Sequence, residues 1–445
     1  MQEKQNENNH IEKIKIKVPY KSKEIIAYLP EDGYRGSFAL QWPQTKVSPE
    51  NLFMESIQNP IGVLENPFNK NIHHLNISIA ISDSFRYTGI ELFIKNMMNY
   101  FISCGAQPEN LKFLVSVGSH RPPTETELKS ILTPEIYDAY KQNILVPNPE
   151  DLQQYEYLGR TKRGTPVYIY KEVMKSDLLI LTGTILYHYF AGFGGGRKLI
   201  VPGLSALPTI RYNHALSIHP DKCEIHPDVQ LGKLEGNPVA EDLLEATLLT
   251  QKNYFIINTV ISPDKKILNI FCGDIVKAHK AGTEYAQEVY SIKIPKPVDI
   301  VIASAGEAKN FLQSHKALVN AWQARKKPYG KIIFIAPCSE GLGGYQFKEW
   351  LRKRNPKQLV DHLRKNGEVN GQTVISTLEK AVNTYFLTEM DEETINLMGG
   401  QKIKTVEEGF HLACKDLKKV GISKPSWLVL PHASYSVPYV QQNKQ

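Results

Sequence analysis

The chain has 445 residues, of which 42% are hydrophobic and 22% are charged, and this composition is typical of a soluble globular protein. A chain of this length is too long for a single ordinary core, so we expect two domains. The net charge of +7 is spread along the chain, so anionic small molecules are at least as well suited as ligands as nucleic acid is. The sequence therefore does not require a nucleic-acid partner.

The five cysteines and the N-terminal residues bear on the cellular compartment of the protein. The cysteines are widely spaced and never form a CxxC pair, which favours a reducing environment over a disulfide framework. The first ten residues are polar, and no apolar run reaches the roughly 18 residues needed to span a membrane. We expect a cytoplasmic protein without a membrane partner.

Apolar runs alternate with helical patterns from the start of the chain to residue 289. Strands are predicted over 14–18, 24–29, 75–82, 111–117, 166–170, 177–182, 254–261 and 266–272. Helices are predicted over 90–103, behind the capping-box residues Thr124 and Glu127, and over 238–249 and 275–289. This alternation is typical of an α/β protein with mainly parallel sheets.

The alternation of predicted strands and helices is interrupted at residue 291 and resumes at residue 299. Residues 291–297 contain two prolines and are predicted to be a linker. Beyond it we expect strands over 299–304, 331–336 and 427–431 and helices over 312–324 and 345–353. We therefore predict an N-terminal catalytic and cofactor-binding domain over 1–290, a second α/β domain over 298–410, and a C-terminal segment over 411–445.

Polar residues follow the ends of three predicted strands. They are Asp83 with Arg86, the Gly118–Arg121 segment, and the stretch from His188 to Lys198. Ligands of open α/β sheets bind outside the carboxyl ends of the strands, so these residues should meet in one crevice.

The third of these segments is rich in glycine. Gly192, Gly194, Gly195 and Gly196 precede Arg197 and Lys198. Glycines let a backbone approach a ligand closely, and successive N–H groups followed by basic side chains suit a phosphate or a carboxylate. An ordinary glycine-rich connection with a solvated basic end is the alternative. The segment is not a Walker A loop, because Leu199 stands where Ser or Thr should hold magnesium.

Histidines supply the candidate acid–base groups. His120 and His188 lie on separate strand-exit loops, and an ordinary histidine titrates near pH 6.5, so the two could exchange protons from opposite sides of a substrate. Each could instead be a capping or packed histidine. His219, Cys223 and His226 superficially suggest zinc, but their spacing fits no zinc module.

Gln313 and Lys316 are three residues apart at the start of a predicted helix in the second domain and therefore share a face. Together they suit a carboxylate, although a solvated surface pair would look the same.

Taken together, six motifs resemble the nickel-pincer lactate racemase family of 2-hydroxy acid racemases and epimerases. In order they are Asp83-x-x-Arg86, Gly118-Ser-His-Arg121, His188-x-x-Ala-Gly-Phe-x-Gly-Gly-x-Lys198, Asn213-His214, Gly236-Asn-Pro238 and Gln313-x-x-Lys316. The resemblance runs from about residue 14 to the C-terminus. It implies two α/β domains with the active-site cleft between them, and a segment over 411–445 that could return to the first domain.

The resemblance also implies a cofactor and the residues that hold it. The cofactor is a pyridinium mononucleotide whose thioamide and thiocarboxylate bind nickel, and it would be attached covalently to Lys198 with His214 as a further nickel ligand. Asp83, Ser84, Phe85, Arg86, Gly194, Gly195 and Gly196 would line the cofactor. His120 and His188 would be the acid–base residues, and Arg86, Gln313 and Lys316 would bind the substrate. Enzymes that make the cofactor would be the partners.

The implied reaction inverts C2 of a 2-hydroxy acid by proton-coupled hydride transfer. Phe85 stands where the family usually has threonine, and Leu312 stands where lactate-type members tend to have tyrosine, so we expect a substrate other than lactate. Three alternatives remain: a phosphate- or nucleotide-dependent enzyme that uses the Gly192–Lys198 loop without nickel, a non-catalytic cofactor-binding protein, and a nucleic-acid binder.

Overall fold

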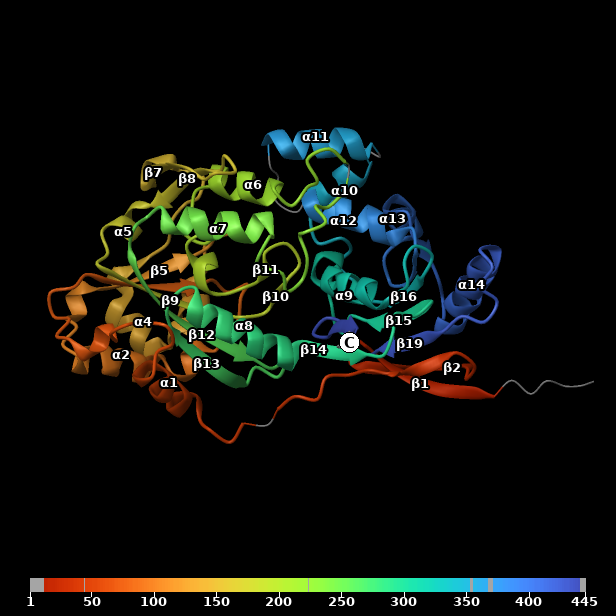
Figure 1. Ribbon diagram of the computed structural model, residues 1–445, viewed down its shortest axis with the longest axis horizontal. Coiled ribbons are helices and arrows are strands. Elements are labelled where there is room, and N and C mark those ends of the chain that lie inside the picture. The colour runs from red at the N-terminus through yellow and green to blue at the C-terminus, as the bar shows by residue number, and fades with distance from the viewer. Residues whose placement is uncertain (1–11, 44, 223, 353–354, 367–370, 441–445) are drawn as a thin grey trace, which may run out of the picture. The chain divides into compact units, whose positions relative to one another are not determined.

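The computed structural model describes residues 12–440 except residues 44, 223, 353–354 and 367–370. The chain forms two compact units (Figure 1). Unit 2 contains residues 42–289 and 357–372, and unit 1 contains the residues up to 41, residues 290–356 and those from 373 onward. Each unit is built on a six-stranded sheet, which confirms the prediction of two α/β domains with mainly parallel sheets.

The sheet of unit 2 has the strand order β13-β12-β9-β4-β5-β6. Its strands are β4 (Ile77–Ser82), β5 (Leu111–Ser116), β6 (Ile144–Leu145), β9 (Leu178–Thr184), β12 (Asn253–Ile261) and β13 (Ile267–Gly273). Every pair is parallel except β12 with the edge strand β13. Strands β9, β4 and β5 are consecutive neighbours, so their carboxyl ends lie at one edge of the sheet.

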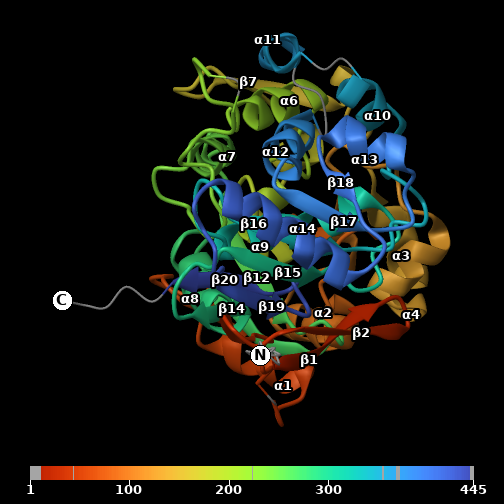
Figure 2. The same ribbon diagram turned by 90° about the vertical axis from the view of Figure 1, so that its right-hand side faces the viewer.

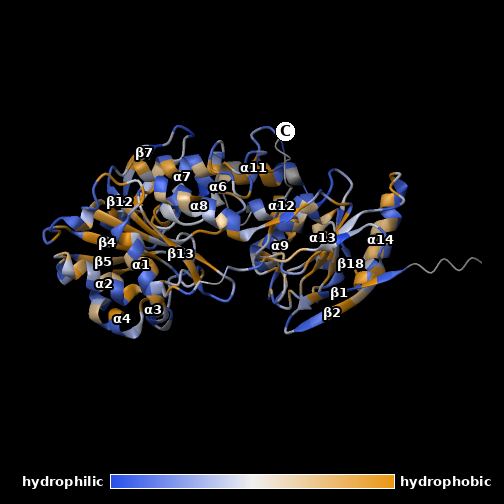
Figure 3. Ribbon diagram, turned by 60° about the horizontal axis from the view of Figure 1, so that its bottom comes forward, coloured by the Kyte–Doolittle hydropathy of each residue, from blue (hydrophilic) through white to orange (hydrophobic). Residues whose placement is uncertain are grey.

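Both faces of this sheet are covered, which explains the nearly continuous apolar runs of its strands. In β9, Leu178 and Ile180 join one core while Leu179 and Leu181 join the other. Helices α1 (Pro49–Gln58), α2 (Ile94–Ser103), α3 (Glu125–Leu132) and α4 (Pro134–Tyr140) supply side chains to the first core. Helices α5 (Lys171–Met174), α7 (Pro238–Leu248) and α8 (Lys277–Tyr290) supply the second. Figure 3 shows β4 and β5 in the hydrophobic colour, whereas α1 and α2 carry both colours.

Smaller elements complete unit 2. They are the hairpin of β7 (Tyr155–Arg160) and β8 (Pro166–Tyr170), the hairpin of β10 (Tyr187–His188) and β11 (Gly192–Phe193), the short 3-10 helix η6 (Gly196–Leu199), and helices α6 (Leu207–Ala215) and α11 (Pro356–Asn366). The β10–β11 hairpin, η6 and α6 carry most of the predicted site residues.

The sheet of unit 1 is entirely parallel, with the order β18-β17-β16-β15-β19-β3. Its strands are β3 (Tyr34–Ser37), β15 (Ile300–Ser304), β16 (Lys331–Ile335), β17 (Thr384–Leu387), β18 (Gln401–Lys402) and β19 (Trp427–Leu430). Its helices are α9 (Phe311–Ala324), α10 (Tyr345–Arg352), α12 (Gly371–Ala381), α13 (Glu392–Met398) and α14 (Val406–Lys419) (Figure 2). One face packs its apolar side chains against α14 and the hairpin of β1 (Lys13–Tyr20) and β2 (Lys23–Pro30).

This division of the chain differs from the predicted domain borders. The residues up to 41 belong to unit 1 because β3 pairs with β19 and because the apolar face of the β1–β2 hairpin joins that unit's core. The predicted linker over 291–297 contains strand β14 (Ser291–Ile294), which pairs with β20 (Val437–Val440). That pairing, together with β19, keeps the segment from 411 to 440 in unit 1. The chain does pass from unit 2 to unit 1 between residues 289 and 290, next to the predicted border. Backbone pairing between distant segments has no signature in local sequence, so the prolines could not reveal that the residues up to 41 pair with the second unit.

None of the described helices is long and apolar enough to cross a membrane.

Candidate active site

The candidate site lies at the carboxyl edge of the sheet of unit 2. Asp83 follows β4, His120 lies four residues beyond β5, and His188 ends the short strand β10 just after β9. The predicted convergence of these segments agrees with the strand order, because β9, β4 and β5 are parallel neighbours. Two contacts also join the exits: Gly118 N–H donates to Gly203 O at 2.9 Å, and Ser116 Oγ donates to Leu199 O at 2.9 Å.

Asp83 and His120 form a direct pair. His120 Nδ1 lies 2.6 Å from Asp83 Oδ2, and Asp83 is only 2% exposed. The other carboxylate oxygen accepts the backbone N–H of Phe85 at 3.0 Å. A carboxylate accepts and cannot donate, so Nδ1 of His120 carries a proton and Nε2 presents a lone pair. This arrangement makes His120 a base with a buried carboxylate behind it.

The residues after Asp83 surround this pair. The Phe85 ring lies 4.7 Å from the His120 ring and is 49% exposed, and the Arg121 guanidinium lies 5.3 Å from the Phe85 ring centre. Arg86 is exposed, and its guanidinium donates to Phe85 O at 3.1 Å. Phe85 therefore forms an apolar wall beside the base.

Helix α3 anchors the loop that carries His120. Glu127 closes a capping box with Thr124 and binds Arg121 through two hydrogen bonds of 2.8 and 2.6 Å. Hydrogen bonds from Arg121, from the Thr124 backbone and from Ser84 hold the pKa of Glu127 far below its usual value. Ser84 therefore contacts the anchor of the His120 loop, a connection that the sequence did not reveal.

The hydrogen bonds of His188 select the opposite tautomer from that of His120. Its Nδ1 accepts the backbone N–H groups of Phe190 and Ala191 at 3.2 and 3.1 Å. Since Nδ1 is an acceptor, the neutral ring carries its proton on Nε2 and presents a donor there. The ring stacks on Tyr189 with a centroid distance of 5.4 Å.

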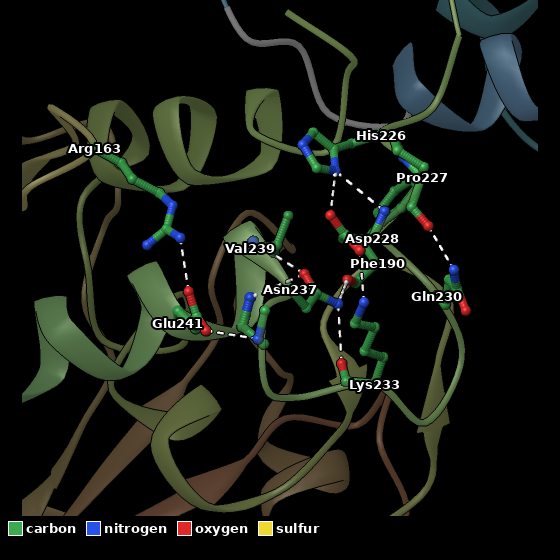
Figure 4. Close-up of polar contacts among 12 residues, drawn as sticks. Arg163, Phe190, His226, Pro227, Asp228, Gln230, Lys233, Asn237, Val239 and Glu241 are labelled. Carbon is green, nitrogen blue, oxygen red and sulfur yellow. Dashed lines mark hydrogen bonds and ion pairs between the residues drawn. The ribbon is translucent and has the colours of Figure 1, made fainter.

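The turn after His188 is held by a loop that precedes α7 (Figure 4). Asn237 donates to Phe190 O at 2.8 Å and to Lys233 O at 3.0 Å, and its Oδ1 accepts the N–H groups of Val239 and Ala240. An ion pair of 2.6 Å between Lys233 and Asp228 closes the same loop. Asn237 thus caps α7 and fixes the His188 turn, which explains a motif that the sequence gave no role.

The glycine loop, residues 192–198, is tied into the protein rather than open to solvent. Gly194 N–H donates to Leu186 O at 2.8 Å, Gly196 N–H to Asn258 Oδ1 at 2.6 Å, and Lys198 N–H to Gly195 O at 3.2 Å. These amides are satisfied internally, so the predicted cradle of successive free N–H groups is not formed.

The glycines themselves have a packing reason. A Cβ on Gly195 would lie 2.6 Å from Asn258 Oδ1, and one on Gly196 would lie 2.8 Å from His279 Cδ2. Both residues also have positive φ angles, of 76° and 52°. The two basic residues at the end of the loop differ in exposure: Arg197 is buried, with 5% of its surface exposed, whereas Lys198 is partly exposed.

Lys198 and His214 are close enough to interact. Burial, and next the charge of Lys198, lower the pKa of His214 to about 4, although the residue as a whole is only partly buried. His214 Nδ1 lies 2.9 Å from Ile210 O, and a carbonyl only accepts, so Nδ1 carries the proton. His214 is therefore neutral, with a lone pair on Nε2, and this is the form in which imidazole binds a metal.

No group of three or more His, Cys, Asp or Glu side chains in the described part of the chain is placed to hold a metal ion. The rings of His219 and His226 lie 6.0 Å apart, and each Nδ1 accepts backbone N–H groups. Cys223 lies outside the described residues.

Gln313 and Lys316 lie in unit 1, on α9. Both are exposed on the first turns of the helix, where Asn310 caps the N-terminus and Gln313 Oε1 accepts the N–H of Lys309 at 3.1 Å. Their role in substrate binding stays a prediction.

Comparison with known proteins shows the family. A model of the lactate racemase N-terminal domain matches residues 20–225, and a model of the lactate racemase C-terminal domain matches residues 294–423. The lactate racemase of Lactiplantibacillus plantarum is 31% identical over 354 residues, which are 78% of this chain and 81% of that protein. The chain belongs to the lactate racemase family.

Further relatives within the lactate racemase family agree along almost the whole chain. The lactate racemase of Thermoanaerobacterium thermosaccharolyticum is 29% identical over 413 residues, covering 90% of this chain and 92% of that protein. The structure of the lactate racemase apoprotein from the same organism superposes with a TM-score of 0.83 at 26% identity, covering 96% of this chain and all of that one. A Thermotoga maritima protein shares the fold alone, with a TM-score of 0.59 at 14% identity.

The resemblance read from the six motifs is thus confirmed, and the protein is an isomerase of the racemase type. Sequence reasoning placed Asp83 on the cofactor and did not pair it with His120. It also missed Asn258 and His279 beneath the glycine loop and the burial of Arg197 beside His279. A lone Asn inside the apolar strand 253–261 was the one available signal for the loop contacts.

Proposed function

We propose that this member of the lactate racemase family inverts the configuration at C2 of a 2-hydroxy acid. The observation that carries the proposal is the hydrogen bond between the buried Asp83 carboxylate and His120 Nδ1, which leaves Nε2 as a base at the sheet edge. A hydride acceptor at C2 would be supplied by a nickel-pincer nucleotide when it is bound.

The residues fit such a cofactor. His214 is a neutral imidazole whose Nε2 lone pair suits nickel, and Lys198 lies close enough to influence its charge. Lys198 would carry the covalent link, and Ser84, Phe85 and Arg86 would line the site beside the His120 loop.

His120 performs the proton transfer. Its Nε2 takes the proton of the 2-hydroxyl while C2 loses hydride, so a planar 2-keto acid forms. Asp83 stabilises the imidazolium that results, because a charge-assisted hydrogen bond strengthens when its donor becomes a cation. With the nucleotide bound as hydride acceptor and donor, His120 would give the proton back to oxygen as C2 regains hydride, and a turn of the planar keto acid before this step would yield the other enantiomer.

His188 has an unequal part in this scheme. To accept a proton at Nε2 it would first have to move its own proton to Nδ1, at the cost of the hydrogen bonds from Phe190 and Ala191. We therefore assign it as a hydrogen-bond donor to the substrate oxygen, in place of the equal acid–base role expected from the sequence. Donation from Nε2–H polarises the carbonyl of the keto acid without a change of charge on the ring.

Charge and shape bear on the substrate. The Arg86 guanidinium suits the carboxylate. The exposed Phe85 ring beside His120 favours a C2 substituent that is larger and more apolar than the methyl group of lactate. We further propose that Gln313 and Lys316 bind the substrate carboxylate.

The test uses full-length protein produced together with enzymes that make the nickel-pincer nucleotide. We expect bound nickel, a mass increase on the Lys198 peptide, and interconversion of the enantiomers of at least one acid in a panel of 2-hydroxy acids. Protein that binds no nickel and gains no mass would contradict the cofactor assignment. Loaded protein that interconverts no acid in a broad panel would favour a non-catalytic binding role.

A further inference from the structure

Three buried polar side chains meet beneath the glycine loop, and no part of the proposed chemistry uses them. Asn258 lies in the middle of β12 and is 0% exposed, His279 lies on α8 at 1%, and Arg197 belongs to the loop itself at 5%. Burying polar side chains costs free energy unless their hydrogen bonds are made. Their hydrogen-bond partners therefore indicate which part of the structure they hold in place.

Asn258 joins the loop to the sheet. Its Oδ1 accepts the Gly196 N–H at 2.6 Å, and its Nδ2 donates to Leu181 O at 3.0 Å. Its strand partner across the parallel pair is Gly183, where a Cβ would lie 3.2 Å from the Gly195 Cα. The missing side chain of Gly183 thus lets the loop descend onto the strand, and Asn258 holds it there.

His279 joins the same loop to α8. Its Nε2 lies 2.8 Å from Gly194 O, and its Nδ1 lies 3.3 Å from Arg197 Nη1. A carbonyl only accepts and a guanidinium only donates, so the neutral ring donates from Nε2 and accepts at Nδ1. Burial, and then the Arg197 charge, lower the pKa of His279 to about 3, which agrees with a neutral ring.

These contacts end at the backbone of Lys198. Lys198 N–H donates to Gly195 O at 3.2 Å, and Lys198 O accepts the Gly203 N–H at 3.1 Å. The carbonyl of Arg197, one residue earlier, accepts the hydroxyl of Thr247 at 3.4 Å. The lysine backbone is therefore fixed by a loop that the sheet and α8 hold from below, while its side chain stays partly accessible.

We propose that Asn258 and His279 are positioning residues for Lys198, which fix the glycine loop so that the lysine amine is presented to the cofactor. The proposal rests on the proposed function for the identity of the ligand, but not for the contacts that hold the loop. Neither side chain needs to touch the substrate or the cofactor.

The test compares four variants of the full-length protein. Asn258→Leu and His279→Leu remove the contacts at similar volume, whereas His279→Gln keeps one donor and one acceptor. Asn66→Leu is the matched control, because Asn66 is 6% exposed in the same unit, donates to Ile57 O at 2.7 Å and accepts the Phe68 N–H at 3.1 Å. Two quantities are measured: amide hydrogen exchange over 194–198 in cofactor-free protein, and the fraction of protein that carries the Lys198 mass increase after co-production with the cofactor-making enzymes.

We expect Asn258→Leu and His279→Leu to speed exchange over 194–198 by at least about tenfold and to lower the fraction of adduct by a similar factor. Asn66→Leu should lower the melting temperature but leave both quantities near wild type, and His279→Gln should stay close to wild type. Wild-type exchange and adduct in both leucine variants would overturn the proposal, as would an equal loss of adduct in Asn66→Leu.

Failure of the proposed function gives a different result. If wild-type protein gains no adduct, the tether at Lys198 is refuted, and the exchange data alone decide whether Asn258 and His279 hold the loop. If Asn258→Leu does not fold, the comparison of His279→Leu with His279→Gln decides the question, because only the leucine variant lacks both hydrogen bonds.

Discussion

Replacing Asp83 with asparagine should nearly abolish racemisation, because the amide cannot satisfy both of the contacts that the carboxylate makes. Asp83 accepts from His120 Nδ1 at 2.6 Å and from the Phe85 N–H at 3.0 Å. If the amide oxygen faces Phe85, its NH₂ group faces His120 and drives the ring proton to Nε2, where the base is needed. If the oxygen faces His120, two N–H donors confront each other at Phe85.

The magnitude follows from these contacts. A hydrogen bond to a charged group contributes about 1.5–3 kcal/mol, which corresponds to a loss of about 10- to 150-fold in rate if it is needed in the transition state. The wrong tautomer adds to this loss, since the same exchange in a Ser-His-Asp triad lowers kcat by about 10⁴-fold. For Asp83→Asn we therefore expect kcat per cofactor-loaded protein to fall by about 10²- to 10⁴-fold.

The assay is the initial rate of enantiomer interconversion by chiral chromatography, divided by the loaded fraction from intact mass. Asp299→Asn is the control, because Asp299 is also buried, at 3% exposure, and accepts from Ser426 and Lys326 in unit 1. This variant should be less stable but retain its turnover. A kcat for Asp83→Asn within about threefold of wild type would refute the assignment of Asp83 as the residue that orients His120.

Four further outcomes are expected. His120→Gln should lower kcat by at least about 10³-fold because an amide cannot take a proton. His188→Gln keeps an N–H donor, so its kcat should fall by only about 10- to 100-fold. Equal falls in kcat would contradict the unequal roles of the two histidines. Lys198→Arg keeps the charge but should carry no adduct, and a retained mass increase would refute the tether. The pKa of His279 is lowered to about 3, below the value of about 6.5 for an unfolded histidine. The contribution of this ring to the free energy of unfolding is therefore highest above about pH 6.5 and falls by at most about 1.4 kcal/mol per pH unit as the pH drops toward 3. Urea titrations of cofactor-free protein between pH 7 and 4 should show a smaller fall for His279→Gln than for wild type, and an identical pH dependence would contradict the buried neutral ring. Leu312→Tyr should shift substrate preference toward smaller acids, and an unchanged profile in the same panel would remove Leu312 from the substrate pocket.

The sheet of unit 2 was predictable because its strands are long and apolar. The runs at 75–82, 111–117, 177–182 and 254–261 all became strands of that sheet. The polar residues beyond the first three follow its carboxyl edge, where Asp83 and His120 are in contact. Local hydrophobic patterns sufficed there, since both faces of a covered parallel sheet are buried.

Unit 1 was harder to predict. No elements were predicted between 354 and 426, where α12 to α14, β17 and β18 of this unit lie. The strands there have only four and two residues, and such short runs do not stand out against the flanking helices. The placement of β3 beside β19 depends on chain segments nearly 400 residues apart, and no local pattern records it.

Within the site, residue types predicted chemistry better than they predicted contacts. His120 and His214 were assigned by motif, and the structure gives both a protonated Nδ1 and a free Nε2 lone pair. The tautomer of His188 could not be predicted from sequence, because it depends on the direction of the backbone N–H groups in its own turn. The glycines were predicted to admit a ligand, and that role stays a prediction; the structure adds that Asn258 and His279 occupy the space that a Cβ on Gly195 and Gly196 would need.

The pairing of β3 with β19 also sets an order of events during synthesis. Strand β3 is synthesised long before β19, so it has no strand partner until Trp427 and Val429 have been made. Unit 2 has its whole six-stranded sheet between residues 77 and 273, so it can fold while the rest of the chain is still being translated. The edge of β3 therefore stays unpaired until β19 has been made. A circular permutant that starts near residue 42 and joins residue 445 to residue 1 would synthesise β3 after β19, with only β20, β1 and β2 between them. Such a permutant should aggregate less during cell-free translation than the natural order of the chain, because β3 no longer waits for its strand partner to be made.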